Sequence, residues 1–203
     1  MQANMTSCIT AAGGMRNVIY MHAGFMFVGW GVMIPIGVIL ARFAKHFPNA
    51  LWFTLHWRIQ SVGLIVAIIG WAIALVNFNV FGSVGTRSYY HGIFGMITML
   101  LGILQPINAF LRPHNPEEGE TKSSLRLAWE ILHKASGYIA VILGAFTIVL
   151  GSFLLPMVSD QTVLRVVYGI VLALFLGLIV YLVLNAKKMQ ESKKKVPRKE
   201  EDA

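Results

Sequence analysis

The sequence predicts an all-α integral membrane protein with five transmembrane helices, of which the first four form a bundle. Hydrophobic residues make up 56% of the 203-residue chain and charged residues only 13%, a more apolar balance than that of soluble domains. Five apolar runs reach about 20 residues or more, long enough to cross a hydrocarbon core of about 30 Å. The sequence lacks the alternating segments of about ten residues that indicate a β-barrel.

The first run, residues 18–41, follows a segment without a separate apolar region and cleavage site, so we expect it to insert uncleaved. The next runs cover residues 50–77, 88–111 and 127–155, and the longest connection, PHNPEEGETKSS, has the composition of a solvated loop. The fifth run covers residues 162–185. The predicted parts are a short N-terminal segment at 1–17, a four-helix core at 18–155, a fifth transmembrane helix at 156–186 and a basic C-terminal tail at 187–203.

Basic residues are distributed unevenly between the two sides of the predicted bundle. Of the 17 lysines and arginines, only Arg16, Arg87 and Arg165 lie on the side of the N-terminus. By the positive-inside rule we expect the N-terminus outside and the C-terminus on the cytoplasmic side. The basic tail is expected to be a solvated anchor at the membrane surface rather than a nucleic-acid site.

Four of the six histidines fall one to two turns inside the first four predicted helices, one on each helix. Ionisable residues within membrane spans are costly and usually functional. Consecutive helices run antiparallel, so the histidines of the first and third helices reach one depth, and those of the second and fourth reach the other. Four histidines thus form two pairs: His22 with His91 on the outer side, and His56 with His133 on the inner side.

Two imidazoles that face each other across a bundle are the axial ligands of a six-coordinate b-type haem. A zinc site would need further ligands, and Cys8 is the only cysteine. The sequence therefore predicts two haem b groups, with these four histidines binding the iron. His46 and His114, in polar connections, are expected to be surface residues.

Small residues follow the histidines at offsets of about 7 and 11 on the same helix face. We interpret this stripe as space for a flat porphyrin, with close small-xxx-small helix packing as the alternative. The stripe comprises Gly63 and Ala67 after His56, Thr98 and Gly102 after His91, and Ala140 and Gly144 after His133, with Gly95 and Gly137 one turn from a ligand.

Haem propionates or an anionic electron donor would need cations at the two ends of the bundle. The candidate cations are Arg42, Lys45, Arg112, Arg126 and Lys134 on the inner side and Arg16 and Arg87 on the outer side. Each of these, taken singly, is more often a topology signal than a ligand contact. Gln105, near the inner end of its helix, suits either a hydrogen bond to a propionate or a bridge between helices.

The histidine-bearing stretches HAGFMFVGWGVMIPIGVILARF, LHWRIQ, HGIFGMITMLLGILQPINAFLRP and WEILHKASGYIAVILG resemble the cytochrome b561 family, especially its branch linked to DOMON domains and its ferric-chelate-reductase relatives. The resemblance covers residues 18–155. It implies a two-haem transmembrane oxidoreductase that takes electrons from ascorbate on the cytosolic side and reduces monodehydroascorbate or a ferric chelate on the other. It also implies the same histidine pairs, with ascorbate held by Arg42, Lys45, Arg112 and Lys134.

The expected partners are membrane lipid, the small-molecule donor and acceptor, and a second copy or a DOMON-type subunit. No nucleic acid is expected. An alternative function is that of a haem-bearing or structural membrane subunit of a larger complex. Proton or ion transport through the intramembrane histidines is the weakest hypothesis, because Glu130 is the only acidic residue within the first four predicted helices.

Overall fold

Long apolar runs fold as helices in a membrane because only a helix satisfies its backbone hydrogen bonds within a single segment. The computed structural model describes the backbone of residues 2–114 and 121–195, and the side chains of residues 13–82, 84–114 and 121–186. Within these ranges five helices are long and apolar enough to cross a membrane, which confirms the predicted fold class. They are Gly13–Phe43, Pro48–Asn77, Arg87–Phe110, Ser124–Ser152 and Val158–Ala186.

The first span is one continuous rod with a change of helix type in its middle. It consists of α1 (Gln2–Met26), the π-helical segment η1 (Phe27–Met33) and α2 (Ile34–Phe43). Helical structure therefore includes nearly all of the predicted N-terminal segment 1–17. A π-helical stretch shifts the register of the side chains that follow it, and such stretches are frequent at functional sites.

Short turns connect the rod to the next two spans. The 3-10 turn η2 (Pro48–Ala50) has positive φ at Asn49 and Ala50, 53° and 52°, and leads into α3 (Leu51–Asn77). After η3 (Phe81–Ser83), the hydroxyl of Thr86 accepts a hydrogen bond from the backbone N–H of Tyr89 and so caps α4 (Arg87–Phe110).

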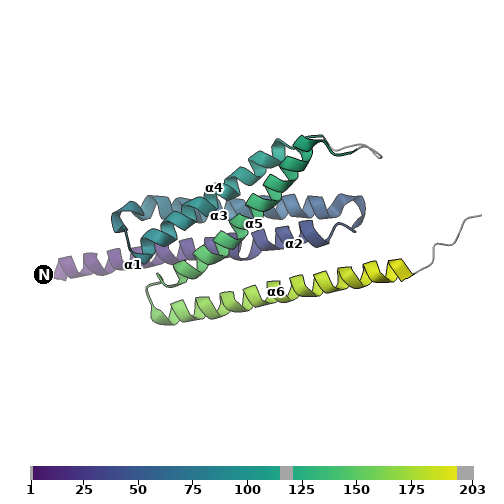
Figure 1. Ribbon diagram of the computed structural model, residues 1–203. Coiled ribbons are helices and arrows are strands. Elements are labelled where there is room, and N and C mark those ends of the chain that lie inside the picture. Colours follow the sequence, from purple (N-terminus) through teal and green to yellow (C-terminus); the bar gives the residue numbers. More distant parts are fainter. Residues whose placement is uncertain (1, 115–120, 196–203) are drawn as a thin grey trace, which may run out of the picture.

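The last two spans are α5 (Ser124–Ser152), capped by Ser123, and α6 (Val158–Lys195). In Figure 1, α3 lies beside the α1–η1–α2 rod, α4 and α5 run together across them, and α6 runs along the other side of the rod. The ring of Tyr168 on α6 packs edge-on against Phe27, with centroids 5.8 Å apart, and the Tyr20 hydroxyl donates to the carboxylate of Asp160. The side chains of the predicted basic tail lie outside the described residues.

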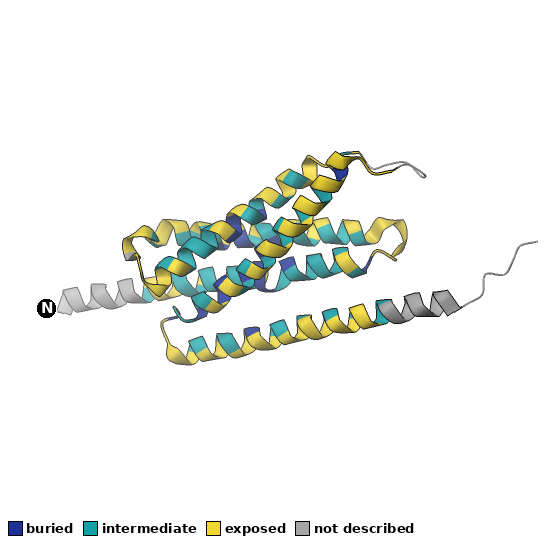
Figure 2. Ribbon diagram, viewed as in Figure 1, coloured by how far each residue is buried: buried dark blue, intermediate teal, exposed yellow. Residues whose placement is uncertain are grey.

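The core lies at mid-span and centres on Trp30 of η1, which is 2% exposed. Its indole N–H donates to the sulfur of Met99 over 3.2 Å. A Cβ placed on Gly102 or Gly144 would lie 2.8 or 2.7 Å from atoms of the Trp30 ring, so these two glycines make room for the indole. Figure 2 shows the buried residues at the centre of the bundle and exposed residues along α6. Because the outward side chains are mostly apolar, they suit contact with lipid.

Candidate functional site

Two of the predicted histidines, His22 of α1 and His91 of α4, face each other near one end of the bundle. This end is called the outer end, and the opposite one the inner end, after the orientation predicted from the sequence. Their ring centroids are 6.0 Å apart and their planes are nearly perpendicular, at 88°. An imidazole nitrogen bonds a transition metal at about 2 Å, so two rings on opposite sides of one ion have centroids on the order of 6 Å apart. The spacing of this pair therefore suits coordination of one metal ion between the rings.

Both rings are held by backbone carbonyls of a neighbouring helix. The Nδ1 of His22 lies 2.8 Å from the carbonyl oxygen of Gly70, and the Nδ1 of His91 lies 3.0 Å from that of Thr147. A carbonyl can only accept a hydrogen bond, so Nδ1 carries the proton and Nε2 keeps a free lone pair. This is the arrangement in which a histidine binds a metal through Nε2.

The inner pair consists of His56 on α3 and His133 on α5. The Nδ1 of His56 lies 2.9 Å from the carbonyl oxygen of Gly37. The ring of His133 is stacked on Trp129, at 9° and 5.3 Å, but its buried Nδ1 has no hydrogen-bond partner within the part of the chain that the structure describes.

The hydrogen bonds also fix the distance between the two pairs. On α3 the interval from His56 to Gly70 is the same as the interval from His133 to Thr147 on α5. Each interval covers about four helical turns, so each helix spans about 21 Å between the two depths. The corresponding interval along the rod, from His22 to Gly37, is longer by a single residue, and this addition coincides with the π-helical segment η1.

The stripe of small residues has two different roles in the structure. At mid-span it serves close packing, as the alternative prediction held: Gly29 approaches the backbone of Gly63, and Trp30 fills the space beside Gly102 and Gly144. One turn from the ligands the space differs: a Cβ on Gly95 would meet only a methyl group of Thr147, at 3.7 Å, whereas one on Gly137 would lie 3.3 Å from the amide oxygen of Gln105. The mid-span residues thus separate the two sites instead of widening them.

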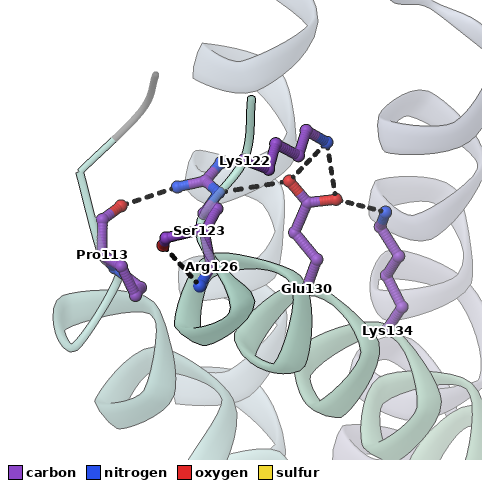
Figure 3. A network of polar contacts seen from close by, with 6 residues as sticks. All are labelled: Pro113, Lys122, Ser123, Arg126, Glu130 and Lys134. Atoms are coloured by element: carbon purple, nitrogen blue, oxygen red, sulfur yellow. Dashed lines mark hydrogen bonds and ion pairs between the residues drawn. The ribbon is translucent and has the colours of Figure 1, made fainter. Parts of the chain in front are cut away.

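Figure 3 shows a cluster of charges at the beginning of α5. Two of its members, Glu130 and Lys134, flank His133 in the sequence. One carboxylate, Glu130, pairs with the ammonium of Lys122 at 2.9 Å, with Nε of Arg126 at 3.1 Å and with the ammonium of Lys134 at 3.3 Å. Arg126 is almost fully buried and also donates to the carbonyl of Pro113 over 2.8 Å. Three cations share one anion, so the cluster carries a net positive charge.

Two of the other cations predicted for the inner end, Arg112 and Lys45, lie against aromatic rings in the same region. The guanidinium of Arg112 lies 5.9 Å from the ring of Trp129, the residue stacked on His133, and 5.8 Å from that of Phe53. Lys45 lies over the ring of Trp52, at 5.7 Å, and Arg42 is exposed in the last turn of α2. Cations from α2, the α2–α3 connection, the end of α4 and α5 thus lie at the inner end of the bundle.

The outer candidate Arg87 has a companion that sequence reasoning did not single out. The guanidiniums of Arg87 and Arg165 lie 4.9 and 4.4 Å from the centroid of one ring, that of Phe153. Arg87 stands one turn before His91 on α4. Two cations from α4 and α6 therefore meet beside the outer histidine pair.

Gln105 bridges α4 and α5, with its amide N–H donating to the hydroxyl of Ser136 over 2.9 Å. The bridging role is one of the two that the sequence left open. His46 and His114 lie outside the paired positions, and the Nδ1 of His46 lies 3.1 Å from the carbonyl of Phe43.

Comparison with known proteins gives the family context of these pairs. The model of the family described as eukaryotic cytochrome b561 matches residues 21–155. A cytochrome b561, DM13 and DOMON domain-containing protein of Arabidopsis thaliana is 36% identical over 68% of this chain, which covers 15% of that protein. A cytochrome b561 and DOMON domain-containing protein of the same plant is 31% identical over 73% of this chain and 37% of its own length.

A putative ferric-chelate reductase 1 of Xenopus laevis is 29% identical over 56% of this chain and 21% of its own length. This chain thus spans well under half the length of these relatives. No solved structure matches it.

Proposed function

This chain belongs to the eukaryotic cytochrome b561 family, a family of haem b-binding membrane oxidoreductases, and we propose that it transfers electrons across a membrane through two b-type haems. His22 and His91 would hold one haem iron, and His56 and His133 the other. When bound, a six-coordinate haem iron alternates between the ferric and ferrous states and so accepts and donates one electron.

The observation that carries the proposal is the hydrogen bonding and spacing of the histidine side chains. In three of them the Nδ1–H group donates a hydrogen bond to a backbone carbonyl, so Nε2 is available to bind a metal. In addition, the two rings of the outer pair have the spacing expected of two ligands of one ion. Two-ligand coordination suits haem because the porphyrin supplies the remaining four donors. The residues present therefore fit the cofactor.

The protein's residues would have different roles at different depths in the bundle. Backbone carbonyls orient the histidines, and the Trp30 core keeps water and other side chains from the region between the sites. Since the helices separate the two depths by about 21 Å, each site would lie near its own face of the membrane. This arrangement supports exchange of electrons with a different partner on each side.

The charges support an anionic donor on the inner side, which we propose to be ascorbate and to be cytosolic. Arg42, Lys45 and Arg112 are the contacts available to it, together with Lys134, which shares Glu130 with two other cations. On the outer side, Arg87 would contact an anionic acceptor, monodehydroascorbate or a ferric chelate. The excess of basic residues on the inner side supports this orientation.

The test is a reduced-minus-oxidised absorption spectrum of the purified protein, with haem quantified per polypeptide. We expect two haems in the wild type, and one in each of His91→Ala and His133→Ala, with different spectra for the two variants. His46→Ala is the matched control, because His46 also bonds a backbone carbonyl through Nδ1 but lies outside the pairs. A folded wild-type protein without haem would refute the proposal.

A further inference from the structure

The hydrogen bonds of the histidines follow a reciprocal rule. The rod and α3 exchange two such bonds: His22 donates to Gly70, and His56 donates to Gly37. Each acceptor stands about four turns after the histidine on its own helix. Each helix therefore supplies a metal ligand at one depth and a carbonyl that orients its neighbour's ligand at the other.

The second helix pair, α4 and α5, completes only half of this exchange. His91 of α4 donates to Thr147, which follows His133 on α5 at the same interval as Gly70 follows His56 on α3. The return bond, from His133 to α4, is missing, and the buried Nδ1 of His133 has no partner among the described residues. A buried polar atom without a hydrogen bond is costly, so its partner is expected to be close by.

The rule points to one position on α4 for this partner. At the same interval after His91 stands Gln105, whose side chain already reaches α5 at the turn that follows His133. Its amide nitrogen bonds Ser136, and its amide oxygen lies 3.3 Å from the position of a Cβ on Gly137. An amide oxygen is an acceptor, as the carbonyls of the other three sites are.

Trp129, the ring in contact with His133, cannot supply the missing bond. Trp129 stacks on His133 and fixes the plane of its ring. Its indole N–H is a donor only and is directed to the carbonyl of Asn108, over 2.7 Å. Trp129 therefore orients the imidazole but leaves its Nδ1–H without an acceptor.

We propose that Gln105 is the positioning residue of the inner site: its amide oxygen accepts the Nδ1–H of His133 when that imidazole binds the haem iron. The inference rests on the proposed function and adds to it a residue that acts through an axial ligand. An acceptor at Nδ1 makes the imidazole a stronger electron donor at Nε2. A stronger donor stabilises the ferric over the ferrous iron and thereby lowers the reduction potential of that site.

Because the proposed acceptor is a side chain, it can be removed by mutation, whereas a backbone carbonyl cannot. Redox titration of the purified full-length protein, followed by absorption, gives the midpoint potentials of the two haems, and His133→Ala identifies the inner one. We expect Gln105→Leu to raise the inner potential and Gln105→Glu to lower it, with the outer potential unchanged in both. The affinity of the inner site for haem is expected to fall about 10- to 100-fold in Gln105→Leu.

Gln60→Leu is the matched control, because Gln60 is also a partly buried glutamine, one turn after His56, but its amide donates to the carbonyl of Ile34. We expect it to leave both potentials unchanged. Two haems per chain with unaltered potentials in Gln105→Leu would overturn this inference and leave the proposed function intact. If Gln105→Leu does not fold, Gln105→Glu decides alone, since an unaltered inner potential there overturns the inference. A wild type without haem would overturn both.

Discussion

The most direct test of the outer site is the substitution Gly151→Ala, which adds a single methyl group on α5. A Cβ at this position would lie 2.6 Å from Cε1 and 3.1 Å from Nδ1 of His91, whereas ordinary contact begins at 3.4 Å. The ring would have to move by roughly 0.8 Å, away from the carbonyl of Thr147 that holds it. Gly151→Ala therefore displaces the proposed ligand His91 without removing it.

The magnitude follows from the cost of such overpacking, about 1–3 kcal/mol. If this strain acts on the ligated ring, the affinity of the outer site for haem falls about 5- to 150-fold, since about 1.4 kcal/mol corresponds to a factor of ten. Haem titration into the haem-free protein measures this change, and we expect the inner site to bind as in the wild type.

The control is Gly24→Ala, on α1 just after His22, where an added Cβ meets nothing within 4 Å. Both substitutions replace a helical glycine by alanine, which favours the helix by about 0.5–1 kcal/mol. The difference in haem affinity between the two variants therefore reports the contact with His91. Equal haem affinity in the two variants would refute the assigned position of His91.

Two further predictions concern the core and the inner charge cluster. Trp30→Ala is expected to destabilise the protein by about 3–5 kcal/mol, measured by thermal unfolding in detergent, and Trp71→Ala, which removes a less buried indole with a similar bond to a methionine sulfur, by less; equal losses would contradict the central role of Trp30. Glu130→Gln releases Lys122 and Lys134 from their shared carboxylate, so the KM for ascorbate should fall at low ionic strength and this gain should shrink with added salt. An unchanged KM in donor-oxidation kinetics would place the donor away from these cations.

The spans were predictable because length and apolarity alone decide what crosses a membrane, and each predicted run overlaps an observed helix. The depth of the histidines was predictable for a related reason, since antiparallel helices convert distance from a helix end into depth. Of the two predicted pairs, His22 and His91 face each other in the structure, with ring centroids 6.0 Å apart. Their role as iron ligands stays a prediction, supported by the carbonyl bonds at Nδ1.

Other features left little or no signal in the sequence. The acceptors at Gly37, Gly70 and Thr147 are backbone atoms, which every residue possesses, so no residue type marks them. The small residues Gly102 and Gly144 were interpreted as space for a porphyrin or as sites of close packing, and nothing in the sequence showed that Trp30 of another helix fills the space beside them. By contrast, the pairs that Glu130 forms with Arg126 and Lys134 could have been found, because a spacing of four residues places charges side by side on a helix.

The hydrogen bonds that the histidines make at Nδ1, and the bonds to haem iron that they would make at Nε2, join different helices. Hydrogen bonds at Nδ1 connect the rod with α3, and α4 with α5, so they act within each helix pair. Coordination at Nε2 would connect α1 with α4, through His22 and His91, and α3 with α5, through His56 and His133. Each haem would thus bridge the two helix pairs at one depth, while the protein's own hydrogen bonds hold each pair together. The same rings would then fix the electron carriers and would add, at both depths, to the contact that Trp30 of the rod already makes with Gly102 of α4 and Gly144 of α5 at mid-span.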